Sequence, residues 1–184
     1  MNAVAHMPEL TPFEALVDYE RRSLAHVAGT PELVDAPGVW RGIAFRCGAR
    51  YLVSGIAEIG EILALPQVAS IPGTKRWLLG IANVRGNLIP VVDLRDYIEG
   101  ERTFPSEASR VMLVRQPGGQ VGLLIDEVVG QRGFSEHQRE SARGESDERY
   151  APFVGEVVAL GGEDWGLFSM SELVRTPDFQ SAAA

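Results

Sequence analysis

The chain has 184 residues, 45% of them hydrophobic and 23% charged, which is typical of one folded domain or of two small ones sharing a core, so disorder along the whole length is excluded. Because 25 Asp and Glu residues outnumber 17 Lys and Arg, the net charge of −8 disfavours binding to nucleic acid or to an anionic membrane. No apolar run approaches the ~20 residues of a spanning helix, so no membrane insertion is expected. A lone cysteine, Cys47, and the lack of a signal-like N-terminus indicate a cytoplasmic protein.

An amphipathic helix is predicted to begin at Thr11-Pro12-Phe13-Glu14, which combines an N-cap threonine, a proline at the first helical position and a glutamate that can close a capping box. Gly29 and Pro31 end the pattern. The helix either packs against the rest of its own chain, the commoner arrangement, or docks on a partner. Its apolar face comprises Phe13, Leu16, Val17, Leu24 and Val27.

From Val39 onward, short apolar runs broken by Gly, Pro and Asn predict β-strands. The gaps between runs are mostly too short for a crossover helix, so the strands should pair largely antiparallel. Gly86-Asn87 is predicted to form a two-residue hairpin turn, and Pro117-Gly118-Gly119 a second connection. The predicted strands are Val39 to Cys47, Ile62 to Val68, Leu79 to Val84, Leu88 to Asp93, Arg110 to Arg115, Val121 to Ile125 and Val154 to Leu160.

The β-rich region contains a weak internal repeat. At an offset of 69, the pattern of Ile43 to Arg46 recurs in Met112 to Arg115, and at an offset of 76 that of Ile89 to Leu94 recurs in Trp165 to Met170. Two related five-stranded units with a shared apolar layer are therefore predicted. The second copy carries an insertion, Ser135 to Arg149, which has no large apolar residue and is expected to be an exposed, mobile loop.

Residues that could support catalysis or ligand binding are few. His6, His26 and His137 have no partner at a metal-ligand spacing, and no glycine-rich loop is suited to a nucleotide, so neither a metal nor a cofactor is expected. Asp93 and Asp126 each end an apolar strand and could form an acid pair, although aspartates in this position commonly cap the following turn or helix.

Arg85 is the strongest candidate for a contact residue. It precedes the Gly86-Asn87 turn, where its side chain is not needed for the core. It is either a solvated loop arginine or, on a rigid turn with little bulk beside it, an anchor for a protein interface.

The stretch from Gly80 to Arg95 closely resembles the G-x-x-N-L-R-G-x-x-x-P-V-x-D-L-R signature of CheW-like chemotaxis adaptors, with Val84 at the usual leucine position. The resemblance extends from about Val39 to Val174. Trp77 and the helical N-terminal extension make the chain most similar to the members of this family in type IV pilus twitching-motility systems.

The resemblance implies a mainly β fold of two intertwined five-stranded SH3-like barrels around a shared core, in a CheW-like domain at 39–174, with a helical extension at 1–38 and a C-terminal tail at 175–184. It also implies a non-catalytic adaptor at membrane-associated receptor arrays. Such an adaptor bridges the regulatory domain of a CheA-type histidine kinase and the cytoplasmic tip of a methyl-accepting chemoreceptor.

By position, Arg85 and Gly86 correspond to residues tied to receptor and complex function, and Gly80 and Asn83 shape the same edge. A second set of positions, expected to face the receptor or the kinase, comprises Ile59, Glu61 and Ile62. Three alternatives remain: an adaptor for flagellar chemotaxis, a purely structural β-protein that scaffolds pilus components without a kinase, and a small acid–base enzyme that uses Asp93 and Asp126.

Overall fold

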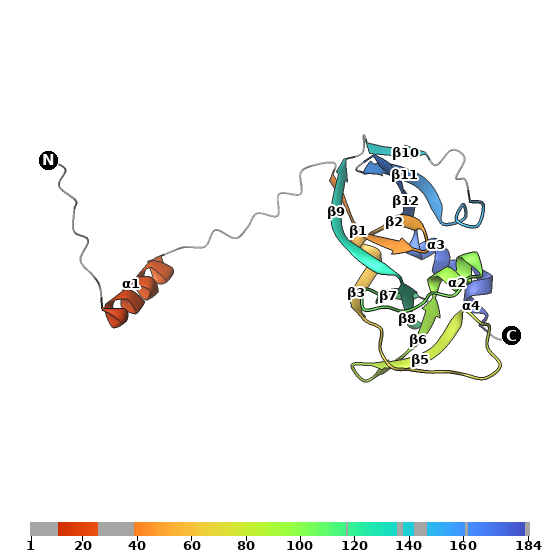
Figure 1. The fold of residues 1–184 in the computed structure, drawn as a ribbon, viewed down its shortest axis with the longest axis horizontal. Helices are drawn as coiled ribbons and strands as arrows, with labels where there is room; N and C mark the ends of the chain where they lie inside the picture. Colours follow the sequence, from red (N-terminus) through yellow and green to blue (C-terminus); the bar gives the residue numbers. More distant parts are fainter. Residues whose placement is uncertain are drawn as a thin grey trace. The chain divides into compact units, whose positions relative to one another are not determined.

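The computed structural model describes residues 11–25, 39–116, 118–135, 138–141, 147–160 and 162–182 (Figure 1). The chain divides into two units, Met1–Ala36 and Pro37–Ala184, which are described separately. None of the helices within the described ranges is long and apolar enough to cross a membrane.

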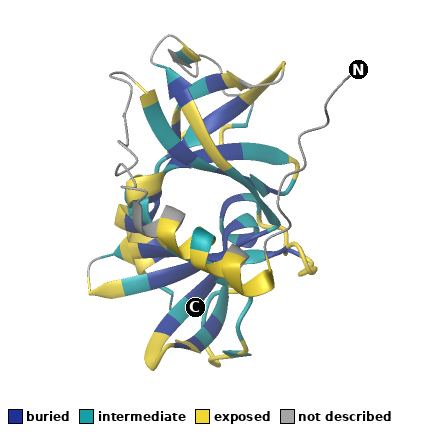
Figure 2. Cartoon of the chain, turned by 90° about the vertical axis from the view of Figure 1, so that its left-hand side faces the viewer, coloured by how far each residue is buried: buried dark blue, intermediate teal, exposed yellow. Residues whose placement is uncertain are grey.

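The first unit contains helix α1 (Pro12–Ala25), whose predicted start is confirmed. The capping box forms as expected, because the Thr11 backbone N–H donates to the Glu14 carboxylate at 2.8 Å and the Glu14 N–H donates to the Thr11 hydroxyl at 3.4 Å. Phe13 is 75% exposed and Leu16 66% exposed, and Figure 2 shows α1 coloured largely as exposed. The packing of this helix on the rest of its own chain stays a prediction. Val27 and the expected terminators Gly29 and Pro31 lie outside the described residues.

The second unit is mainly β. Its elements in chain order are β1 (Val39–Cys47), β2 (Arg50–Gly55), the 3₁₀ turn η1 (Ile56–Glu58), β3 (Ile59–Ala64), β4 (Val68–Ala69), β5 (Leu78–Val84), β6 (Asn87–Asp93), α2 (Leu94–Glu99), β7 (Arg110–Gln116), β8 (Gly119–Ile125), β9 (Glu127–Ser135), β10 (Arg139–Ser141), β11 (Val154–Leu160), β12 (Glu163–Phe168), α3 (Met170–Arg175) and α4 (Pro177–Gln180).

The strands form two sheets with the same architecture. One sheet has the order β10-β11-β12-β2-β1-β9 and the other, read from its far edge, β4-β5-β6-β8-β7-β3. Each contains one parallel pair, β12 with β2 and β6 with β8, and is otherwise antiparallel. The predicted repeat is therefore present in three dimensions. Each sheet has six strands instead of five, because the short strands β4 and β10 add one to each edge.

Irregularities in the ladder also repeat, which supports a common origin of the two halves. The register shift between Ile59 and Glu61 recurs 69 residues later, where β1 passes from Gly130 to Val128. The shift between Leu78 and Gly80 recurs 76 residues later, between Val154 and Glu156. The helices after β6 and β12 begin alike, since Asp93 and Ser169 each accept a hydrogen bond from the backbone N–H three residues on.

The two halves exchange strands. Strands β1 and β2 of the first half join β9 to β12 of the second, whereas β7 and β8 of the second half join β3 to β6 of the first. A small apolar cluster lies within each sheet, and a large one between them takes residues from both sheets and from α2, α3 and α4. This shared core matches the expected layer, and it explains why several strands are apolar at consecutive positions.

Several sequence predictions need correction at the level of elements. The run Ile62 to Val68, expected to be one strand, is divided between β3 and β4. Strands β2 and β9 were not predicted, because arginine and glycine interrupt their apolar pattern. The expected tail after Val174 is part of the folded unit: Phe179 of α4 is 5% exposed and stacks on Trp77, with ring centroids 5.9 Å apart.

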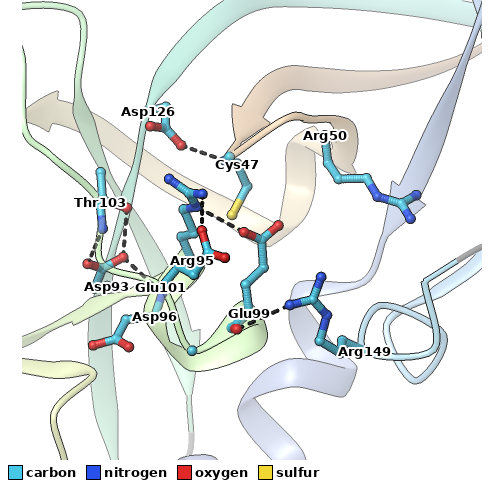
Figure 3. A network of polar contacts seen from close by, with 12 residues as sticks. Cys47, Arg50, Asp93, Arg95, Asp96, Glu99, Glu101, Thr103, Asp126 and Arg149 are labelled. Carbon is cyan, nitrogen blue, oxygen red and sulfur yellow. Dashed lines mark hydrogen bonds and ion pairs between the residues drawn. The ribbon is translucent and has the colours of Figure 1, made fainter.

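The insertion Ser135 to Arg149 is not wholly a loop, because it contains β10, and its C-terminal end is anchored. The Arg149 guanidinium donates to the Glu99 carbonyl at 3.1 Å, and the hydroxyl of the fully buried Tyr150 donates to the Glu99 carboxylate at 2.8 Å. Arg50, from the β1–β2 connection, lies over the Tyr150 ring (Figure 3). These contacts tie α2 of the first half to the segment before β11 of the second.

The anchor is expected to weaken in acid. Hydrogen bonds from Arg149 lower the pKa of the Asp147 carboxyl to about 2, below its unfolded value. Because the folded pKa is depressed, its stabilising contribution is present above about pH 4 and is lost as the pH falls towards 2. A ¹³C NMR titration should place the Asp147 midpoint well below 4 and restore an ordinary value in Arg149→Gln. A native midpoint near 4 would contradict the ion pair.

Candidate functional site

The β5–β6 turn presents Arg85 at its tip. Val84 pairs with Asn87, so the two turn residues are Arg85 and Gly86, not Gly86 and Asn87 as the sequence suggested. Both have positive φ, 52° and 87°, as a type I′ hairpin turn requires. Arg85 is the only non-glycine residue with positive φ in the described part of the chain. An arginine in this unfavourable conformation favours a role at the surface over one in folding.

Asn83 and Gly80 shape the hairpin through backbone contacts. The Asn83 side-chain oxygen accepts a hydrogen bond from the Gly86 N–H at 2.8 Å, which fixes the turn. Gly80 lies further down β5 with φ 142°, and a Cβ there would come within 2.0 Å of the Ala69 carbonyl oxygen. Gly80 thus allows β4 to pair closely with β5. Its place in the signature has a structural cause that does not need a partner.

Arg85 and Glu61 meet, although their strands are far apart in the sheet. The Arg85 guanidinium lies 2.7 Å from the Glu61 carboxylate, and the two side chains are 77% and 32% exposed. Strand β3 is at one edge of the sheet, whereas β5 is the fifth strand. At about 4.8 Å per strand, a flat sheet would hold the two strands roughly 19 Å apart. The sheet therefore curls until its hairpin tip reaches its opposite edge, consistent with the expected barrel.

Ile59 and Ile62 do not join this surface. The register shift at Gly60 places these residues, three positions apart, on the same face of β3, where both are half-buried against the shared core. Glu61 alternates with Ile62 and lies on the other face. The structure thus brings Arg85, Gly86, Asn83 and Glu61 together and separates the two isoleucines from them.

An apolar groove beside the turn was missed in the sequence. It has a volume of about 480 Å³ and lies between β4, β5 and the start of β6. Leu88, 73% exposed, borders it, whereas its neighbours Ile89 and Val91 are buried. Strict alternation along β6 already implied that Leu88 points away from the core. The lining residues are Gln67, Val68, Ala69, Ile81, Asn83 and Leu88.

Replacing Gly86 is expected to cost stability through its backbone alone. The positive φ disfavours any side chain, yet an added Cβ would meet no atom within 4 Å. Gly86→Ala should therefore lower the free energy of unfolding by about 1 kcal/mol, and Gly86→Val by more. Urea denaturation measures both. Unchanged stability in both variants would contradict the turn geometry.

The candidate acid pair is engaged in structural contacts. Asp93 caps α2 and accepts hydrogen bonds from the Thr103 N–H and hydroxyl, both at 2.8 Å. Asp126 accepts one from the Gly48 N–H at 2.7 Å. Figure 3 shows the two carboxylates bound to different backbone segments. These contacts match the capping interpretation and do not supply a shared cleft.

Cys47 is also unsuited to nucleophilic chemistry. Its side chain is fully buried, and burial raises the pKa of the thiol to about 12. Among the described residues, no group of three or more His, Cys, Asp or Glu side chains could hold a metal ion.

A curled, duplicated β-fold with an exposed arginine on a rigid hairpin is the arrangement of an adaptor that works by contact. Residues 41–178 match the CheW-like domain family. The chain therefore belongs to the CheW-like family of adaptor and scaffold proteins, which confirms the resemblance seen in the signature. The fold agrees, since the crystal structure of scaffolding protein TtCheW from Thermoanaerobacter tengcongensis superposes with a TM-score of 0.62 at 23% identity, over 70% of this chain and 88% of that one.

Among named relatives, the chain is 34% identical to Protein PilI of Pseudomonas aeruginosa over 173 residues, 94% of this chain and 97% of that protein. It is 28% identical to Chemotaxis protein CheW of Rhizobium meliloti over 140 residues, 76% of this chain and 90% of the relative. For Chemotaxis protein CheW of Thermotoga maritima, the identity is 24% over 106 residues, 58% of this chain and 70% of the relative. The predicted similarity to the pilus branch is thus confirmed.

Proposed function

We propose that this protein is a non-catalytic cytoplasmic adaptor that couples a methyl-accepting chemoreceptor to a CheA-type histidine kinase in a system controlling type IV pili. The observation that carries the proposal is the exposed Arg85 on its strained, Asn83-fixed turn. The high identity to Protein PilI along nearly the whole chain favours the pilus system over a flagellar one.

The Arg85–Glu61 pair suits a reversible contact. An exposed ion pair contributes at most about 1 kcal/mol to stability, so a partner carboxylate can replace Glu61 without disturbing the fold. Arg85 offers five N–H donors in a planar fork, which can engage two carboxylates at once. The turn is already fixed, so little conformational entropy is lost on binding.

Weak contacts are sufficient for an adaptor in an array. When one molecule holds two partners, the second contact forms at a high effective concentration, and the assembly is tighter than either pair. In this proposal Arg85, Gly86, Asn83 and Glu61 form one partner surface. Ile59 and Ile62, on the other face of β3, contribute their exposed edges to a second.

The test is reconstitution of receptor, kinase and adaptor, with kinase activity as the readout. Arg85→Ala should keep the wild-type circular dichroism spectrum and reduce receptor control of the kinase at least about tenfold, a loss typical of an interface anchor. Arg132→Ala is the matched control, because Arg132 is an exposed arginine on β9 of the other sheet. Receptor control unaffected in Arg85→Ala would refute the assignment of this surface.

The pilus assignment needs a cellular readout. Deleting the gene should abolish twitching and leave swimming intact. Loss of swimming with normal twitching would favour the flagellar alternative.

A further inference from the structure

Helix α1 carries an apolar face with an acidic residue inside it. Phe13, Leu16 and Val17 are exposed on one side of the helix. Glu20, also exposed, follows Leu16 by four residues and Val17 by three, so it lies on the same face. Whatever covers this face must offer an apolar surface and a cation for Glu20, because a buried unpaired carboxylate is costly.

The helix is not required by the CheW-like fold. The family match begins at residue 41, beyond α1. The match to Protein PilI spans 173 of the 184 residues, so at most about 11 residues stay unmatched and the similarity must reach into α1. A segment shared within the pilus branch but outside the family domain is suited to a contact of its own.

The groove beside Arg85 has the complementary chemistry. Four of its six lining residues are apolar and none is acidic, and Leu88 stands exposed at its border. Arg85, on the tip of the same hairpin, is 77% exposed and can bind a second carboxylate beside Glu61. Two α1 helices, by contrast, match poorly with each other, since an antiparallel pair would place Glu20 of one near Glu14 of the other.

We infer that α1 of one copy docks in the β4–β5–β6 groove of a second copy, with Glu20 paired to Arg85. A second copy is favoured because of where the connecting segment joins the second unit. In Figure 1, β1 begins at one end of that unit and the β5–β6 hairpin forms the opposite end. A helix reaching its own groove would have to hold the 13 residues from 26 to 38 stretched along the unit, at a cost in chain entropy.

Reciprocal docking closes a symmetric dimer with two identical contacts. Because the groove adjoins the Arg85 surface, the dimer and the partner-bound adaptor compete for Arg85. This inference goes beyond the proposed function and is testable on the chain alone.

The test is sedimentation equilibrium of the full chain, from about 1 to about 300 µM, a range that covers weak dimers. The wild type should form a dimer. Leu16→Asp and Leu88→Asp, on opposite sides of the contact, should each be monomeric. Both residues are exposed, so both variants should keep the native circular dichroism spectrum.

A charge exchange identifies the ion pair. Glu20→Arg and Arg85→Glu should each weaken the dimer about tenfold or more, and the double variant should return to within about threefold of the wild type. A monomeric wild type at every concentration overturns the inference, since it leaves α1 to its own unit or to another protein. A dimer that persists in Leu88→Asp overturns the assigned groove.

Discussion

Gly80→Ala should lower the free energy of unfolding by about 3 kcal/mol or more, the largest effect expected from any single added methyl group in this fold. Two costs combine. The φ of 142° is strained for any residue with a Cβ, and the new Cβ would come within 2.0 Å of the Ala69 carbonyl oxygen. Backbone cannot yield as a flexible side chain can, so relief requires β4 to leave β5 and lose its pairing at Val68 and Ala69.

Urea denaturation of Gly80→Ala checks this result against Gly155→Ala. Gly155 has no positive φ and an added Cβ there meets no atom within 4 Å, so the control should stay within about 0.5 kcal/mol of the wild type. Equal stability of the two variants would show that β4 does not approach β5 so closely. Displacement of β4 also removes one wall of the groove, so Gly80→Ala should impair contacts made there.

Phe179→Ala is expected to cost about 3 to 5 kcal/mol, as large-to-small aromatic changes in cores do. Phe179 is 5% exposed, stacks on Trp77 and meets Tyr97 edge-on at 5.1 Å. The Lys75 N–H donates to the Ala182 carbonyl at 2.9 Å, which holds the chain after α4 in place. Removing the ring leaves a cavity against Trp77.

Thermal unfolding followed by tryptophan fluorescence measures the loss, with Phe104→Ala as the control. Phe104 is 86% exposed, so its truncation should change the stability by no more than about 0.5 kcal/mol. If both variants lose the same stability, α4 is not part of the core.

The sequence revealed the strands whose apolar residues are consecutive and the repeat that relates them. Strand β1 was predicted with its observed ends, because both of its faces contribute to the core. Strand β9 was missed because Gly130, Gly133 and polar residues interrupt it, and its strand conformation depends on pairing with β1. Its pairing partner is over 80 residues away, which no local pattern encodes.

The candidate site was predicted in part. Arg85 was found from its place before a turn, and the family signature added Glu61. Their contact could not be predicted, because it depends on how far the sheet curls. The orientation of Ile59 and Ile62 depends on the register shift at Gly60, which moves a whole strand end from one face to the other. The helix α4 was missed because four residues are too few for a helical period to be visible.

The exchange of β1–β2 and β7–β8 between the halves bears on folding during synthesis. As the chain leaves the ribosome, the sheet from β3 to β8 has all its strands once Ile125 has emerged, whereas β1 and β2 must wait for strands that end at Phe168. The first hairpin made is thus among the last to gain its neighbours. Such long-range pairing slows folding and leaves an apolar hairpin exposed meanwhile. A nascent chain arrested between these two points should hold one finished sheet and a protease-sensitive N-terminal hairpin.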